Sequence, residues 1–369
     1  MKAWVARAGG QPAQLETVDV AGPLAGEVRV RLAASGVCGS DLHVLAGHSP
    51  VAQFPVVLGH EGAGVVTEVG TGVTSVSPGD HVVIALYGPC LACPNCLSGN
   101  AVHCNGPARV KAIRGEMADG STRLSVGGEK VFPFVGSGTL AQEAVLRASQ
   151  VVAVAPDVPL DTICLAGCGV TTGLGAVFNI ALVQPGESVA VVGCGGVGLS
   201  VIQGARIAGA GQIIALDTNP LKLGMARRMG ATDGVLLEEQ GVVEAVSQVC
   251  PSGVDVAFEV VGNGDLVAAA LASTRPGGRC VMVGSPPAGT TIPVDGRVLF
   301  SERRLLGCTG GSNIPARDIP RIERLYRSGV LDLEGLVSQR FSFDDTPAAI
   351  AAAQAGQVAR AVVVMEGSV

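Results

Sequence analysis

Residues 188–198 read Ser188-Val-Ala-Val-Val-Gly-Cys-Gly-Gly-Val-Gly198 and decide the fold of the chain. The stretch begins as a short apolar strand and passes through Gly193, Gly195 and Gly198, spaced as G-x-G-x-x-G, into a segment of helical character. Asp217 follows 19 residues after Gly198, at the end of the next predicted strand. A glycine turn between a strand and a helix, with an acidic residue about 20 residues further on, is typical of a dinucleotide-binding unit.

Each residue type in this turn has a physical task. Gly193 permits the tight turn, Gly195 lets the backbone approach a pyrophosphate, and Gly198 allows the helix to pack closely on the strand. The N-terminus of the helix then offers free N–H groups to the anion. A carboxylate at Asp217 would accept hydrogen bonds from a ribose and repel a 2′-phosphate, so the sequence favours NAD over NADP. The other candidates at this site are Gly196 and Lys222. For Lys222 the alternative, an ordinary solvated lysine on a helix, is nearly as good an interpretation.

Strands alternate with helices on the C-terminal side of this turn. Ile213–Asp217, Val254–Val261 and Arg279–Gly284 read as strands, and Pro220–Gly230 reads as a helix. This alternation predicts a parallel, doubly wound sheet, and it fades near residue 312.

The N-terminal part of the chain is rich in β signals. Val28, Val30 and Leu32 alternate with arginines, which predicts a half-exposed strand, and residues 56–84 combine valines with glycine turns. The order of a β-rich region, an α/β region and a return to mixed character predicts an inserted domain. We therefore expect one domain from 1–169 and 313–369, and a second from 170–312.

Composition limits the function classes. Of the 369 residues, 48% are hydrophobic and 15% charged, which excludes intrinsic disorder. The formal net charge of −6 argues against a nucleic-acid or anionic-membrane partner. We expect no signal peptide and no membrane span, and eleven cysteines without an export signal favour a reducing, cytoplasmic location.

Four cysteines are clustered within 15 residues. Their spacing is C-x2-C-x2-C-x7-C, in a stretch with little hydrophobic periodicity. Four thiolates suit a tetrahedral Zn²⁺ with no open position, so the pattern predicts a structural zinc site, with a redox-active C-x-x-C pair as the alternative. These residues are Cys90, Cys93, Cys96 and Cys104.

A second set of metal-binding residue types is dispersed along the chain. It comprises Cys38 in Cys-Gly-Ser-Asp, His60 in Gly-His-Glu-Gly-Ala-Gly and Cys168 in Gly-Cys-Gly-Val-Thr-Thr-Gly. Spacing alone would not join them, because lone cysteines and histidines are usually ordinary core or polar residues.

These motifs, together with the four-cysteine stretch, the glycine turn with Asp217 and Phe258-Glu-Val-Val-Gly, resemble the zinc-dependent alcohol dehydrogenases of the medium-chain dehydrogenase/reductase superfamily. The resemblance runs nearly end to end. It implies an α/β chain with a GroES-like β-barrel catalytic domain, a structural zinc lobe and an inserted Rossmann domain. Residues 104–140 look like the longer-chain form, which is usually a homodimer, whereas shorter forms are often tetramers.

The resemblance also implies the roles of the dispersed residues. Cys38, His60 and Cys168 would hold a catalytic zinc, giving two Zn²⁺ per subunit, and the open fourth position would take water or substrate. Glu61 would lie behind the metal, and Asp41 would hold the free ring nitrogen of His60.

An alcohol would then be oxidised to an aldehyde or ketone, or the reverse. The resemblance implies a zinc-bound alkoxide that gives its hydride to NAD. Ser40 would pass the proton through a cofactor ribose to His43, which titrates near neutrality when unperturbed and whose alternative is an ordinary surface histidine.

The resemblance assigns further positions. Thr172 and Val197 would contact the nicotinamide side of the cofactor, and Arg360 would pair with the pyrophosphate. Leu86 and Leu140 would line a roomy aliphatic substrate pocket.

Gly39 departs from the family, since many relatives carry Arg or His there, and this predicts weaker cofactor binding. The sequence leaves two alternative functions open. One is a thiol-adduct-dependent formaldehyde dehydrogenase. That branch usually has an anion-binding arginine just past the structural zinc, whereas here Arg109 is displaced by one position. The other alternative is a nucleotide-sensing, zinc-binding regulatory module.

Overall fold

The computed structural model describes residues 1–238 and 240–365 and divides into two compact units. Unit 1 contains Met1–Cys168, Ile314–Tyr326 and the described part of Val337–Val369, and unit 2 contains Gly169–Asn313 and Arg327–Leu336.

The predicted boundaries differ from this division by one residue at each junction, since Gly169 and Asn313 belong to unit 2, and in one longer segment. Arg327–Leu336 lies with unit 2, although we expected the whole of 313–369 in the other domain. Gln203 explains the difference, because its side chain donates to Asp332 O and accepts from Asp332 N, both at 2.8 Å. We still only predict that residues 170–312 form a domain with a function of its own.

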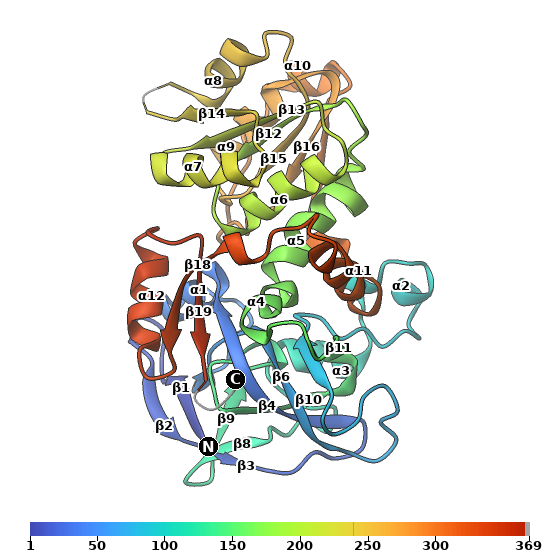
Figure 1. Ribbon diagram of the computed structural model, residues 1–369, viewed down its shortest axis with the longest axis vertical. Coiled ribbons are helices and arrows are strands. Elements are labelled where there is room, and N and C mark those ends of the chain that lie inside the picture. Colours follow the sequence, from blue (N-terminus) through green and yellow to red (C-terminus); the bar gives the residue numbers. More distant parts are fainter. Residues whose placement is uncertain (239, 366–369) are drawn as a thin grey trace. The chain divides into compact units, whose positions relative to one another are not determined.

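Unit 2 is built on a six-stranded sheet in which every neighbouring pair of strands is parallel. Its helices lie on both faces of the sheet (Figure 1). The predicted doubly wound sheet is confirmed, and its strand order reverses between β12 and β15, where such folds bind dinucleotides. In spatial order the strands are β14 (Asp233–Leu236), β13 (Gln212–Asp217), β12 (Ser188–Val192), β15 (Val254–Glu259), β16 (Thr274–Met282) and β17 (Arg304–Gly307). The helices are α5 (Gly169–Gly175), the π-helix η5 (Ala176–Ala181), α6 (Gly196–Ile207), α7 (Pro220–Met229), α8 (Val242–Val249), α9 (Gly264–Ala272) and α10 (Gly296–Phe300), with short 3₁₀ turns η6 (Gly310–Ser312) and η7 (Glu334–Leu336).

Local chemistry fixes the elements around β13 and α7. The side chain of Asn219 accepts from Leu221 N at 2.9 Å and so caps the first turn of α7, whose first residue is Pro220. Gly230 ends the helix in the left-handed region, with φ of 117°, which a residue with a side chain rarely adopts. The predicted helix 220–230 therefore ends where its glycine requires.

Unit 1 contains two sheets around one apolar core. The first has the order β2 (Gln14–Thr17), β1 (Lys2–Ala6), β5 (Val56–Val57), β9 (Glu129–Pro133), β8 (Leu124–Val126) and β3 (Asp19–Val20). The second has the order β11 (Val151–Ala153), β7 (His81–Ile84), β6 (Glu61–Val69), β4 (Glu27–Val37), β19 (Arg360–Val364) and β18 (Val337–Ser342), and β10 (Glu143–Arg147) pairs with β4. The expected β-rich region is confirmed, and it includes strands from both ends of the chain.

The predicted half-exposed strand is confirmed over residues 28–32, where Val28, Val30 and Leu32 are buried. β4 extends to Val37, and of its alternating arginines Arg31 is exposed and Arg29 is half-buried. The rest of β4 is buried, and the strand lies inside the sheet with β6 on one side and β10 and β19 on the other.

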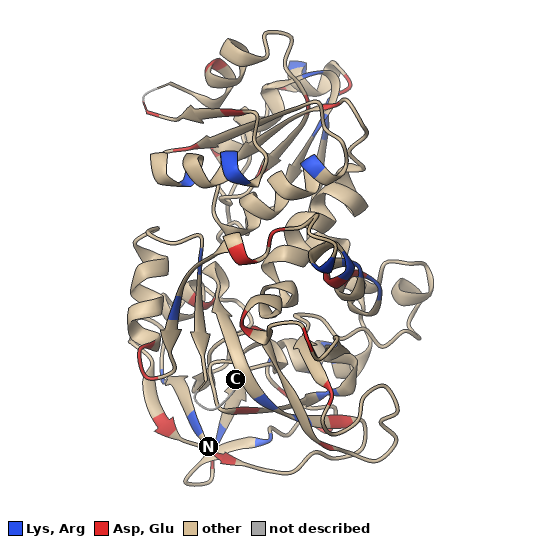
Figure 2. Cartoon of the chain, in the orientation of Figure 1, with Lys and Arg blue, Asp and Glu red and all other residues tan. Residues whose placement is uncertain are grey.

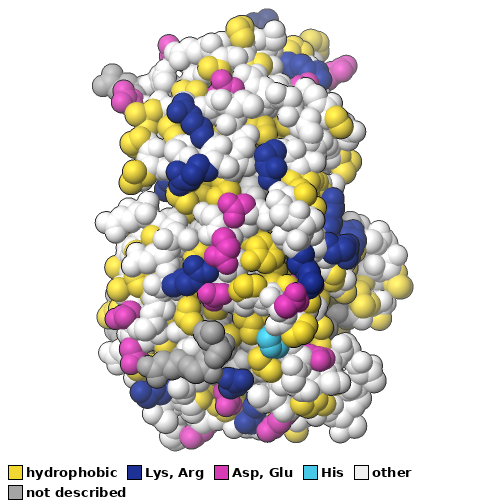
Figure 3. All heavy atoms as spheres, in the orientation of Figure 1, with side chains coloured by type: hydrophobic (Ala, Val, Ile, Leu, Met, Phe, Trp, Pro, Cys, Tyr) yellow, Lys and Arg dark blue, Asp and Glu magenta, His cyan; other side chains and the backbone are white. Residues whose placement is uncertain are grey.

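The helices of unit 1 are short and lie between or beside the strands. They are α1 (Gly39–Leu45), α2 (Pro94–Leu97), α3 (Pro107–Ile113), α4 (Leu160–Ile163), α11 (Pro315–Arg327, whose last residue falls in unit 2) and α12 (Thr346–Gln354), with 3₁₀ turns η1 (Ala101–His103), η2 (Phe134–Gly136), η3 (Ala148–Gln150) and η4 (Cys164–Gly167). Basic side chains stand out on α7 and α11 (Figure 2), while on the face shown in Figure 3 acidic and basic groups are interspersed.

The described residues contain no single helix that is long and apolar enough to cross a membrane. One bent pair, Leu160–Gly167 with Gly169–Ala181, reaches that length and hydropathy only when both halves are combined, and most residues of both halves are buried.

Candidate metal and dinucleotide sites

The pairing of β4 brings three distant parts of unit 1 together. The C-terminal end of β4 runs antiparallel to the starts of β6 and β19, so that Gly36 faces Glu61 and Val37 faces Ala361. Cys38 directly follows β4 and His60 directly precedes β6, which places them side by side. Cys168 joins them because Gly167 O accepts from Leu86 N at 3.0 Å, beyond the end of neighbouring β7.

The three predicted ligands of the catalytic zinc converge. The ligating atoms of Cys38, His60 and Cys168 lie within 4.8 Å of one another, and all three residues are buried. Nε2 of His60 is buried and has no hydrogen-bond partner among the described residues. A buried imidazole nitrogen without a hydrogen-bond partner costs free energy unless something binds it. Two sulfurs and one nitrogen are the donors that zinc prefers, so the residues present fit this metal.

Asp41 fixes the orientation of the His60 ring. Its Oδ1 lies 3.3 Å from His60 Nδ1 and also accepts from Gly59 N at 2.9 Å, while its Oδ2 accepts from Cys38 N at 3.0 Å. Because a carboxylate only accepts, this contact keeps a proton on Nδ1, and Nε2 points toward the thiols.

Electrostatics act in opposite directions on the two thiols of this cluster: interaction with Cys38, together with burial, raises the pKa of Cys168 well above its ordinary value. Interaction with the Cys168 thiol, aided by the positive charge of Arg360, holds the pKa of Cys38 well below its ordinary value. Burial alone would lower the pKa of His60, but Asp41 outweighs it and raises that pKa well above the usual range. A thiolate is the form that binds a metal.

Glu61 and Arg360 form a buried ion pair beside this cluster. Their closest oxygen and nitrogen lie 3.6 Å apart, and the two side chains are 0% and 7% exposed. A Cβ at Gly36 would come within 2.3 Å of Glu61 Oε2, so only glycine leaves room for the carboxylate. The predicted contact of Arg360 with a pyrophosphate stays a prediction.

The two predicted relay residues lie on one helix. Ser40 and His43 are three residues apart on α1, which places them on the same side of the helix. Ser40 is half-buried and His43 is exposed, so the pair leads outward. The ring of His48 lies near His43, with the centroids 6.5 Å apart.

One predicted pocket residue is wrong. Leu140 is 0% exposed and belongs to the apolar core, with backbone hydrogen bonds to Leu58 and Trp4. The side chain that lies against the metal ligands is Phe134, whose ring meets His60 edge-on at 5.3 Å. Leu86 is half-buried and donates its N–H to Gly167 O, and its place in a substrate pocket stays a prediction.

The four clustered cysteines converge within unit 1. The four sulfur atoms lie within 4.8 Å of one another, and the backbone N–H groups of Cys90 and Cys93 point at sulfurs at 3.3 Å. Amides that donate to sulfur lower the pKa of Cys93 to about 6. Four converging sulfurs without an open side fit a structural zinc ion.

Arg109 does not reach the surface beside this cluster. It is 4% exposed, and its guanidinium carbon lies 4.6 Å from the centre of the Tyr87 ring. A buried guanidinium stacked on an aromatic ring is unavailable to an anionic substrate at a pocket mouth.

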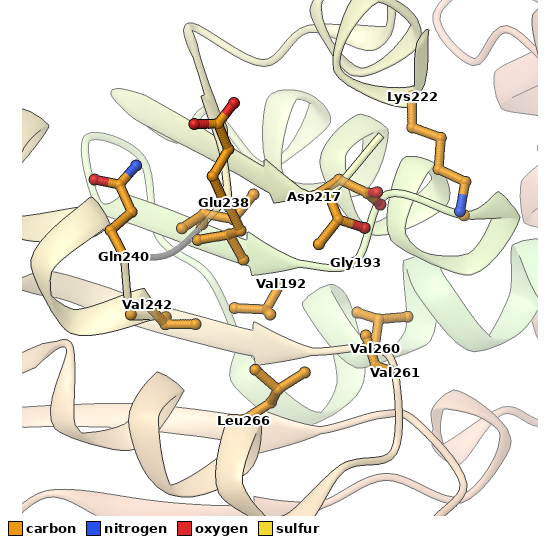
Figure 4. Close-up of a pocket in the computed structure, with 15 residues that line it drawn as sticks. Val192, Gly193, Asp217, Lys222, Glu238, Gln240, Val242, Val260, Val261 and Leu266 are labelled. Atoms are coloured by element: carbon orange, nitrogen blue, oxygen red, sulfur yellow. The ribbon is translucent and has the colours of Figure 1, made fainter. Parts of the chain in front are cut away.

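The glycine turn opens onto a cavity of about 570 Å³ in unit 2. Gly193, Gly195, Asp217 and Lys222 all line it, and Figure 4 shows Asp217 and Lys222 toward the same side of the cavity. Asp217 accepts from Cys194 N at 2.7 Å and from Asn219 N at 2.9 Å, which orients both carboxylate oxygens.

The glycines occupy the positions that the motif requires. Gly193 has φ of +95°, a Cβ at Gly198 would lie 1.9 Å from Gly193 O, and Gly195 has open space where a Cβ would point. Gly196 and Val197 begin α6, and Thr172 lies on α5. None of these last three lines the cavity, so their contacts with a cofactor stay predictions.

Several cavity residues were missed by the motif. They come from the connections after β14 and β15 and from α9: Leu237, Glu238, Gln240, Gly241, Val242, Val260, Val261 and Leu266. The carboxyl ends of parallel strands meet at the reversal in strand order, and this rule identifies the connection after β15 once the order is known.

Comparison with known proteins agrees with this geometry. Residues 24–157 match the alcohol dehydrogenase GroES-like domain family, and residues 196–326 match the zinc-binding dehydrogenase family. The chain is 40% identical over 365 residues to S-(hydroxymethyl)glutathione dehydrogenase of Escherichia coli O139:H28, covering 98% of this chain and 99% of that one.

Two solved structures are also similar. A zinc-binding-domain alcohol dehydrogenase protein from Burkholderia ambifaria has a TM-score of 0.93 and 34% identity, covering 98% of each chain. Benzyl alcohol dehydrogenase from Acinetobacter calcoaceticus has a TM-score of 0.92 and 32% identity, covering 99% of each chain.

Proposed function

This chain belongs to the zinc-dependent alcohol dehydrogenases of the medium-chain dehydrogenase/reductase superfamily, and we propose that Cys38, His60 and Cys168 form its catalytic zinc site. The enzyme is an oxidoreductase that acts on CH–OH groups of small alcohols with NAD(H) and zinc. The observation that carries the site assignment is the convergence of two thiols on a buried imidazole nitrogen that has no partner among the described residues.

When bound, zinc supplies Lewis acidity that polarises a substrate oxygen and eases loss of its proton. The residues of the chain prepare for that chemistry. Asp41 holds the proton on Nδ1 of His60, and Cys38 and Cys168 present their sulfurs in a site that excludes bulk water.

Ser40 and His43 move the proton outward. The Ser40 hydroxyl would take the proton of the substrate hydroxyl as it gives up its own toward His43, whose exposed imidazole can release a proton to solvent; a bound cofactor would supply the ribose hydroxyl between them. NAD would supply the hydride acceptor when bound, and Asp217, which lines the cavity of unit 2, would accept hydrogen bonds from its adenosine ribose.

A thiol-adduct formaldehyde dehydrogenase is the second candidate, and the Escherichia coli relative favours it. The burial of Arg109 against Tyr87 weighs against it, because that guanidinium is not free to bind an anionic thiol adduct. We therefore propose an uncharged alcohol as the substrate, with Leu86 and Phe134 near the metal.

The assembly is a homodimer, and two features of unit 2 support this proposal. β17 is the last strand of its sheet and pairs on one side only among the described strands. Phe300, just before it, is 90% exposed. A second copy of the strand across a two-fold axis would extend the sheet and cover this side chain. The eleven free cysteines favour a reducing, cytoplasmic location.

A first-turnover experiment tests the function. Enzyme near the substrate concentration is mixed with NAD and a panel of alcohols, and NADH absorbance is followed through one turnover. We expect a burst with neutral alcohols that disappears in Cys38→Ser and persists in Cys164→Ser, a matched control because Cys164 is equally buried but lies outside the ligand set. A burst with formaldehyde only when a thiol such as glutathione is added would instead favour the second candidate.

A further inference from the structure

Two buried arginines lie beside the four-cysteine cluster without a carboxylate partner. Arg109 is 4% exposed and Arg147 is 9% exposed. Neither forms an ion pair with any residue that the structure describes, and Nε of Arg109 and Nη1 of Arg147 have no hydrogen-bond partner there. Taking a cation out of water without an opposite charge is among the most costly arrangements in a folded protein.

Both arginines contact the segment that leads into the first cysteine of the cluster, one through its backbone and one through a side chain. Arg147 donates through Nη2 to Gly88 O at 2.5 Å, and the guanidinium of Arg109 stacks on the ring of Tyr87. Cys90 lies two residues after Gly88. Arg147 at the end of β10 and Arg109 on α3 therefore contact the same short segment.

The start of α3 lies directly against the sulfur atoms. Arg109 is the third residue of this helix, and its N–H donates to Gly106 O at 2.9 Å. A Cβ at Gly106 would lie 2.9 Å from Cys90 Sγ and 3.6 Å from Cys104 Sγ. The helix that carries Arg109 thus begins in contact with the cluster.

The arginines have no negatively charged partner, and a zinc-loaded cluster would provide one. Four thiolates around one Zn²⁺ keep two net negative charges, which also need compensation in a partly buried site. Burial lowers the pKa of Arg109, and Cys104 is among the groups that oppose this lowering. For Arg147, burial and then Arg109 lower the pKa, while Cys104 and Cys90 oppose it.

We propose that Arg109 and Arg147 are the counter-charges of the four-cysteine zinc site and stabilise its bound zinc. Each is a positioning residue that acts through the metal cluster and the segment before Cys90. The inference rests on the structural zinc alone, so it stands or fails independently of the alcohol oxidation proposed above.

Thiol accessibility in the zinc-loaded enzyme tests the proposal. Excess chelator and iodoacetamide are added, and the alkylation rate of the peptide that contains Cys90–Cys104 is followed by mass spectrometry. We expect Arg109→Gln and Arg147→Gln each to speed alkylation by about tenfold, the loss expected for one charge-assisted contact. Arg109→Lys and Arg147→Lys keep the charge and should remain closer to the wild type.

The control is Arg114→Gln, because Arg114 caps the other end of α3 and is exposed. In this variant the peptide that contains Cys90–Cys104 should be alkylated at the wild-type rate. Equal rates for the Gln variants and the wild type, or equal acceleration in the Gln and Lys variants, would overturn the proposal.

A second measurement needs no variant and applies if the Gln proteins do not fold. Zinc removal from the wild type leaves both cations uncompensated, so the contacts around them should loosen. The amide of Ala85, which donates to Gln150 O at 2.7 Å, should then exchange faster with deuterium. Faster exchange confined to residues 90–104 would contradict the assignment.

Discussion

Oδ1 of Asp41 lies 3.3 Å from Nδ1 of His60, and both side chains are almost completely buried. A carboxylate in this position fixes the tautomer of a metal-binding histidine and raises its basicity. The same oxygen accepts from Gly59 N, and Oδ2 accepts from Cys38 N, so one side chain organises the backbone at two of the three proposed ligands.

Asp41→Asn should weaken zinc binding at the catalytic site by about 10–100-fold, the range found when such partners of metal ligands are lost. The check is the zinc content after dialysis against a graded chelator, together with kcat. Asp80→Asn is the matched control, because Asp80 also accepts from an amide three residues before it but lies in an exposed turn. Unchanged zinc retention in Asp41→Asn would show that the contact does not matter for the metal.

Gly39→Arg should tighten NADH binding by roughly tenfold, through a charge-assisted contact with the pyrophosphate. A Cβ at Gly39 meets no atom within 4 Å, so the new side chain needs no rearrangement of the backbone. Fluorescence titration with NADH measures the effect. Gly22→Arg, at another open position, controls for added positive charge, and equal affinity in the two variants would refute the prediction.

Asp217→Asn should lower the affinity for NAD and raise that for NADP, because the carboxylate that repels a 2′-phosphate is gone. The amide oxygen of Asn can still accept from Cys194 N in the glycine turn, while the hydrogen bond from Asn219 N is lost, because the amide NH2 group cannot accept. We expect the ratio of the two dissociation constants to shift by about tenfold or more. A parallel loss of both affinities would mean that the substitution damaged the turn instead.

The pair of Arg279 and Glu187 should make the stability of unit 2 depend on pH. Arg279 donates to Glu187 at 2.9 and 2.6 Å and also to Ala181 O at 2.6 Å. Burial alone would raise the pKa of Glu187, but the hydrogen bonds from Arg279 and from Gln184 N bring it below its ordinary value of 4.5.

Because the folded pKa is the lower one, this pair stabilises the protein above about pH 4.5 and loses its contribution as the pH falls through the folded pKa. Glu187→Gln should therefore lower the free energy of unfolding by about 1–2 kcal/mol at pH 7 and by less at pH 4. Denaturant melts of both proteins at the two pH values check this. Glu244→Gln, on an exposed face of α8, should cost little at either pH, and a pH-independent difference for Glu187→Gln would exclude the pair as its cause.

Local patterns predicted the dinucleotide unit well because its elements are set by short-range physics. The alternation of strand and helix, the glycine turn and Asp217 lie within one continuous segment, and β12, α6 and β13 begin and end within about two residues of the predicted bounds. The four-cysteine cluster was equally readable, since all its ligands lie within 15 residues.

The sequence by itself determined the class of each segment, the zinc and NAD chemistry, and the family to which the chain belongs. Only the tertiary structure decided which groups meet. The register of β4 with β6 and β19 joins Cys38, His60 and Arg360 across more than 300 residues of chain. The tertiary structure also buries Leu140 and places Phe134 against His60. It also enclosed Arg109 and Arg147 beside the sulfur cluster. Long-range pairing sets these contacts, and a local pattern of residues carries no information about which strand will be its neighbour.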